Sequence, residues 1–170
     1  TTLYSFILKR IAVIDVLVLA LLYVGRILAG SVVTDTPISE WLASFAVFFF
    51  LSLALVKRAS ELLSTQTKDK LPGRGYQPSD ITFVGLYGVS SAVVSVLILA
   101  FYIYSPRVQM LYSNPGYLWL ICLLLHYWLG RVWLLTFRGQ MHSDPIYFAI
   151  KDKQSYFIGI LASLIGVLAI

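Results

Sequence analysis

Three charged side chains stand together where a long apolar run ends. Residues 41–56 are almost entirely apolar, and Lys57, Arg58 and Glu61 follow directly. Lys57 and Glu61 are four residues apart and Arg58 and Glu61 are three apart, so on a helix all three share one face. Cations at the mouth of a membrane cavity can hold a phosphate, and Glu61 can orient them or help to hold a divalent cation. A solvated helix end at the membrane boundary would show the same charges, and this alternative stays open.

A second polar stretch begins at Arg138 and reads Arg-Gly-Gln-Met-His-Ser-Asp-Pro. Arg138 offers a cation, His142 a titratable imidazole and Asp144 a carboxylate, and these groups suit phosphate and metal. We therefore consider His142 a candidate general base, and Asp144 and Glu61 candidate catalytic carboxylates. The alternative is a polar turn in which Ser143 or Asp144 caps a short helix that starts at Pro145.

Three further charges, Asp15, Arg26 and Arg131, lie inside apolar runs. Asp15 and Arg26 are eleven residues apart, which places both on one face of a helix near its opposite ends. A charge at the centre of a membrane helix costs at least about 2.5–3.5 kcal/mol. We therefore expect all three side chains to be structural or to line a cavity. Arg26 has the alternative of snorkelling to the nearby membrane interface.

The composition indicates an integral membrane protein. Of the 170 residues, 59% are hydrophobic and 12% are charged, whereas soluble domains carry about 25% charged residues. One small core cannot bury this much apolar surface. The net charge of +5 is distributed in clusters between apolar runs, which favours lipid headgroups and phosphates over nucleic acid as partners.

Five apolar segments have the length, or nearly the length, of a membrane-crossing helix. We therefore predict an all-α helical bundle that forms one transmembrane domain over residues 1–170. A short interfacial helix is expected over residues 146–153. Most Lys and Arg residues fall on the side of Lys57, which the positive-inside rule assigns to the cytoplasm. The predicted crossings are residues 11–30, 41–65, 81–104, 117–137 and 156–170.

Four blocks of sequence, taken in order, resemble the C-terminal part of the UbiA superfamily of membrane prenyltransferases. They are residues 4–16, 25–30, 54–62 and 138–149. The likeness is greatest to the branch that includes polyprenyl-phosphate phosphoribosyltransferases. By this analogy the five segments are the last five of about nine helices, and the N-terminal half is absent from this sequence.

The resemblance also implies Mg²⁺ as cofactor and an isoprenoid lipid as substrate. The second polar motif of the family is usually a pair of aspartates, whereas this chain has Lys57, Arg58 and Glu61 at that place. This departure favours contact of the cations with the donor phosphate over direct binding of Mg²⁺ by the protein. The resemblance implies such a phosphate role for Lys57 and Arg58, and a weaker one for Asp144.

The sequence thus predicts a membrane-embedded transferase. It would transfer a prenyl group from a polyprenyl diphosphate to an acceptor, or a phosphoribosyl group to a polyprenyl phosphate, with cations and Mg²⁺ holding the leaving group. The chain alone is expected to be inactive and to need its N-terminal half or a second chain. Two alternatives stay open: a transporter or channel subunit with Asp15, Arg26 and Arg131 along its path, and a non-catalytic membrane scaffold.

Overall fold

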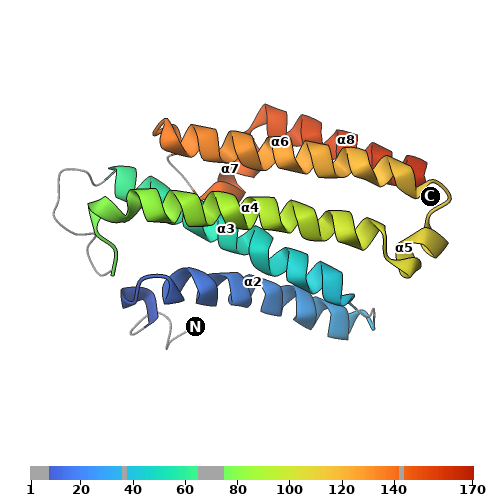
Figure 1. The fold of residues 1–170 in the computed structure, drawn as a ribbon, viewed down its shortest axis with the longest axis horizontal. Helices are drawn as coiled ribbons and strands as arrows, with labels where there is room; N and C mark the ends of the chain where they lie inside the picture. Colours follow the sequence, from blue (N-terminus) through green and yellow to red (C-terminus); the bar gives the residue numbers. More distant parts are fainter. Residues whose placement is uncertain (1–7, 36–37, 65–74, 142–143) are drawn as a thin grey trace.

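The structure is a computed structural model that describes residues 8–35, 38–64, 75–141 and 144–170. These residues contain seven α-helices and three short 3-10 helices (Figure 1). The predicted all-α class is confirmed. In chain order the elements are η1 Leu8–Arg10, α2 Ile14–Val33, α3 Glu40–Ser64, η2 Pro78–Asp80, α4 Ile81–Ile103, α5 Pro106–Leu111, η3 Pro115–Tyr117, α6 Leu118–Phe137, α7 Pro145–Lys151 and α8 Lys153–Ala169.

Four helices in the described part of the chain are long and apolar enough to cross a membrane. They are α2, α3, α4 extended by η2, and α6 extended by η3, and each begins and ends within a few residues of a predicted crossing. The fifth predicted crossing is the shorter apolar helix α8, with 17 residues. At about 1.5 Å per residue α8 is roughly 25 Å long, a little less than a hydrocarbon core of about 30 Å.

Helix α3 lies between the other helices of the bundle. It packs against α2 on one side and against α4 and α6 on the other, and α8 lies along α6 (Figure 1). Leu51, Leu55 and Val56 of α3 are buried in the main core, together with Val84 of α4 and Val132 of α6. The helix that carries the predicted site is therefore the best-buried one, and α2 is at an edge.

Small residues of α4 let three helices approach closely. The Ser52 hydroxyl donates to the Gly88 carbonyl over 2.9 Å, and the Trp133 indole N–H donates to the Ser52 oxygen over 3.0 Å. A Cβ atom on Gly88 would overlap the Trp133 ring, and one on Gly85 would overlap the Phe137 ring. The lack of a side chain at Gly85 and Gly88 therefore permits the close contact of α4 with its neighbours.

Polar side chains fix the starts of three helices. Ser39 accepts a hydrogen bond from the Leu42 N–H at the start of α3. Asp144 accepts from the Ile146 N–H ahead of Pro145, so the cap proposed for the predicted short helix is present at α7. Asp152 has an extended backbone that separates α7 from α8, and it caps α8. The chain therefore turns at Asp152 where the sequence predicted one helix over residues 146–153.

Candidate functional site

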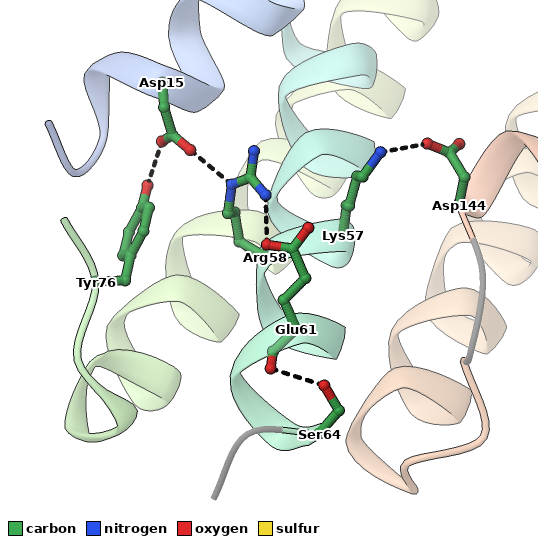
Figure 2. A network of polar contacts seen from close by, with 7 residues as sticks. All are labelled: Asp15, Lys57, Arg58, Glu61, Ser64, Tyr76 and Asp144. Carbon is green, nitrogen blue, oxygen red and sulfur yellow. Dashed lines mark hydrogen bonds and ion pairs between the residues drawn. The ribbon is translucent and has the colours of Figure 1, made fainter. Parts of the chain in front are cut away.

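A cavity of about 340 Å³ opens beside the C-terminal part of α3. Lys57 and Asp144 lie in its wall, and the Lys57 ammonium donates to an Asp144 carboxylate oxygen over 2.8 Å (Figure 2). Their side chains are 43% and 36% exposed, so a ligand in the cavity can reach the ammonium. The other lining residues are Ser60, Glu61, Leu63, Ser64, Thr136, Gly139 and Met141.

Ser60 contributes a second polar group that the sequence analysis did not identify. Its hydroxyl oxygen is buried and has no hydrogen-bond partner among the residues that the structure describes. Ser60 follows Lys57 by three residues on α3, so both side chains belong to one flank of the helix. A buried hydroxyl without a partner is costly, and Ser60 is one of the residues that line the same cavity as Lys57.

Arg58 occupies the opposite flank of α3 and is only 1% exposed. Its Nε donates to an Asp15 carboxylate oxygen over 2.6 Å, and its Nη1 donates to a Glu61 oxygen over 2.6 Å. The Tyr76 hydroxyl donates to the other Asp15 oxygen over 2.8 Å and accepts from the Val13 N–H (Figure 2). This network ties α2 and the segment before η2 to α3 inside the bundle.

The predicted common face of Lys57, Arg58 and Glu61 therefore divides. Lys57 and Glu61 line the cavity, while Arg58 is not among the lining residues and reaches Glu61 from the buried side. The physical reason is that consecutive residues on a helix point about 100° apart. The phosphate role of Arg58 stays a prediction, and the burial of its guanidinium between two carboxylates does not support it.

Arg131 forms a two-point ion pair with Asp152. Its Nη1 and Nη2 donate to the two carboxylate oxygens over 2.8 and 2.9 Å, and its guanidinium lies 5.6 Å from the Phe148 ring centre. Asp152 also accepts from both the N–H and the hydroxyl of Ser155. Arg131 thereby holds the junction of α7 and α8 against α6. The Asp-x-x-Ser pattern of residues 152–155 could have suggested the cap of α8.

The remaining predicted site residues lie away from the cavity or outside the described residues. Arg26 is exposed on α2, with its guanidinium 5.1 Å from the Tyr23 ring centre. Asp15 is fully buried whereas Arg26 is exposed, so the two side chains do not both point into the protein. Arg138 is exposed at the end of α6 and does not line the cavity. His142 lies outside the described residues, and its role stays a prediction.

Hydrogen bonds hold the two acidic residues around α7 in their charged forms. Burial alone would raise the pKa of Asp144, but hydrogen bonds from Lys57 and from the Ile146 N–H lower it below its ordinary value. The pKa of Asp152 is lowered against burial by Arg131 and Ser155. Burial raises the pKa of the Tyr76 hydroxyl. Asp144 is thus an anion at neutral pH, which suits charge pairing better than proton transfer.

The carboxylates of the cavity do not by themselves form a metal site. Glu61 and Asp144 both line it, but they are ion-paired with Arg58 and Lys57 respectively. Within the described ranges there is no group of three or more His, Cys, Asp or Glu side chains that could hold a metal ion. The predicted Mg²⁺ therefore stays an expectation from the resemblance, and the cation that the geometry itself supplies is Lys57.

We expect Asp152→Ala to lower the free energy of unfolding by about 1–2 kcal/mol, because it removes the α8 cap and the partner of Arg131. Asp152→Asn, which can keep the cap, should cost less. The folded-state pKa of Asp152 is lowered, so this stabilisation is present above the ordinary carboxyl pKa of about 3.9 and is lost as pH falls further. Chemical denaturation in detergent at pH 7 and pH 3 measures both effects. Equal, negligible losses for the two variants at pH 7 would contradict this account.

Comparison with known proteins identifies relatives of the chain. The chain is 45% identical to the uncharacterized protein y4nM of Sinorhizobium fredii over 172 aligned residues, which covers 99% of the chain and 33% of that protein. It is 33% identical to nodulation protein NoeC of Azorhizobium caulinodans over 149 residues, 84% of the chain and 47% of that protein. No protein-family model matches the chain, and no solved structure is significantly similar to it.

A third relative has a named activity. The chain is 26% identical to decaprenyl-phosphate phosphoribosyltransferase of Mycolicibacterium smegmatis over 154 residues, 88% of the chain and 48% of that protein. The resemblance to the UbiA family found in the sequence is confirmed as a distant similarity to this transferase. The chain spans between a third and about half of the length of these three relatives.

Proposed function

We propose that the chain supplies about half of a membrane-embedded transferase of the UbiA type, and that its cavity binds a phosphate group of the lipid substrate. The observation that carries the proposal is that Lys57, with a side chain 43% exposed, and Ser60, whose hydroxyl has no partner among the described residues, line one cavity. Both groups are donors suited to phosphate oxygens. The similarity to a decaprenyl-phosphate phosphoribosyltransferase gives the substrate class.

Lys57 is positioned by Asp144 but can change partner. An ion pair between side chains that are 43% and 36% exposed is worth at most about 1 kcal/mol. A phosphate with one or two negative charges can compete with one carboxylate for the ammonium, and Ser60 adds a hydrogen bond. Asp144 would keep its second hydrogen bond, from the Ile146 N–H, and so stay in place as the α7 cap. We assign Asp144 the role of positioning residue.

The cavity borders the apolar part of the bundle, which suits a lipid with a charged head. Leu63 and Met141 belong to the same wall as Lys57, and the four long apolar helices provide the hydrocarbon surface along which a polyprenyl chain can lie. In prenyl transfer the diphosphate of the lipid is the leaving group, and a fixed cation stabilises the negative charge that develops on it. In phosphoribosyl transfer the phosphate of the lipid is the attacking group, and the same cation would hold it in place while diphosphate leaves the other substrate. We place the cavity on the cytoplasmic side, by the distribution of Lys and Arg.

The test is the turnover of the intact protein in membranes, with a polyprenyl phosphate as acceptor and labelled phosphoribosyl diphosphate as donor. Lys57→Gln should lower turnover roughly 10- to 100-fold by removing a charged donor to phosphate. Lys153→Gln, which removes an exposed lysine at the start of α8, is the matched control and should leave turnover unchanged. Thermal unfolding of each variant checks that the fold is intact. Equal turnover of Lys57→Gln and the unmodified protein would refute the proposed role.

A further inference from the structure

Helix α2 has an uncovered side that carries a positive charge. Val16, Ala20 and Val24 form the stripe that is buried against the bundle, and α2 lies at the edge of the bundle (Figure 1). At 100° per residue, Ala29 and Arg26 point away from this stripe, and both are exposed. None of the helices that the structure describes therefore covers the opposite side of α2.

Arg26 lies well inside the apolar length of α2. It is the thirteenth of the 20 residues of the helix, about 16 Å along the axis from Asp15. Its guanidinium lies over the Tyr23 ring, one turn toward the start of α2 and away from the nearer end at Val33. Tyr23 in turn stacks on Phe50 of α3, with 4.9 Å between ring centres. These contacts direct the charge toward the middle of the helix and not toward the closer interface.

A charge inside a membrane helix is costly, and such side chains mostly face a protein partner or a wet cavity. No carboxylate of the described residues forms an ion pair with Arg26. Small residues on the same side, Gly25 and Ala29, would admit a close neighbour, since a Cβ on Gly25 would meet nothing within 4 Å. The shape and the charge of this side thus both fit another helix.

We propose that the open side of α2 docks a transmembrane helix that carries an Asp or Glu at the depth of Arg26. Charge complementarity selects this partner, and the relatives, of which the chain spans only 33–48%, contain further chain from which it could come. A second copy of this chain docking through the same face would bring Arg26 against Arg26, and like charges repel. The proposal holds whether or not the Lys57 cavity binds phosphate.

The experiment uses the full chain, labelled with a fluorescence donor, in phosphatidylcholine liposomes. The probe is an acceptor-labelled single-span Leu/Ala peptide with one central Asp, compared with a peptide that has Leu at this position. Energy transfer from the unmodified chain and Arg26→Lys should report association with the Asp peptide. Arg26→Leu and Arg26→Gln should weaken the association with the Asp peptide roughly tenfold. Arg107→Leu, which removes an exposed arginine of α5, is the matched control and should bind normally.

Each outcome decides the proposal. The proposal is supported if the unmodified chain associates more strongly with the Asp peptide than with the Leu peptide and if either neutral Arg26 variant loses this preference. Equal association of the Asp and Leu peptides, or undiminished association with both neutral variants, overturns it. Association of neither peptide with the unmodified chain also overturns it, because Arg26 is then accommodated by lipid and water alone. Circular dichroism of each variant in the same liposomes verifies that the helices are formed.

Discussion

Arg58→Met should lower the free energy of unfolding of this chain by about 3–5 kcal/mol, the cost of breaking a buried ion pair by removing one partner. Asp15 is fully buried and Arg58 is 1% exposed. The substitution keeps most of the side-chain volume, so the loss comes from the Asp15 carboxylate that is left in the core without its guanidinium. Chemical denaturation in detergent, followed by tryptophan fluorescence, measures the effect.

A double-mutant cycle separates this charge effect from packing. Asp15→Leu combined with Arg58→Met removes both charges, and the double variant should be more stable than the sum of the two single losses predicts. Lys57→Met changes a residue of the same helix but breaks a pair whose side chains are 43% and 36% exposed, and it should cost at most about 1 kcal/mol. A loss below 1 kcal/mol for Arg58→Met would show that the network around Asp15 does not stabilise the bundle.

Gly88→Val should cost about 3 kcal/mol by overpacking the junction of α3, α4 and α6. The first added carbon would overlap the Trp133 ring and lie 3.0 Å from Leu55 Cβ. Moving Trp133 would also break its hydrogen bond to Ser52. Replacing Gly in a helix by a better helix former stabilises by less than about 1 kcal/mol. The overlap is the larger effect, so Gly88→Val should destabilise the protein.

Gly130→Val is the matched control for this prediction. A Cβ on Gly130, within α6, would meet nothing within 4 Å, so the substitution should be neutral or slightly stabilising. Both variants are compared by chemical denaturation in the same detergent. If Gly88→Val and Gly130→Val unfold at the same denaturant concentration, the close approach of the three helices at Gly88 is wrong.

The helices could be predicted because their signal is local. Long apolar runs bounded by Pro, Gly and charged residues placed α2, α3, α4 and α6 within a few residues. A break between the short helix and the last crossing was predicted after residue 153, whereas it lies at Asp152, because a hydrophobic pattern does not fix the residue at which a helix ends. That break depends on Asp152 capping α8 while it binds Arg131, 21 residues earlier in the chain.

The site was predictable only in part, because a sequence shows which residues are charged but not which of them are buried. The cluster at the end of α3 was found from its spacing. Which flank faces α2 could not be known without the tertiary contact of Asp15 and Tyr76 with this cluster. Ser60 was missed because a serine in a helix carries no signal until its surroundings are known, and the salt bridge of Lys57 with Asp144 joins residues 87 positions apart.

Whether Lys57 acts on phosphate is decided by the turnover ratio of Lys57→Gln to Lys153→Gln, in the intact protein with a polyprenyl phosphate and a phosphoribosyl diphosphate. We expect a ratio of roughly 0.1 to 0.01, with both variants folded, because Lys57 lines the cavity and Lys153 does not. A ratio near one would contradict it and would leave the charges at the end of α3 as a structural feature of the membrane boundary.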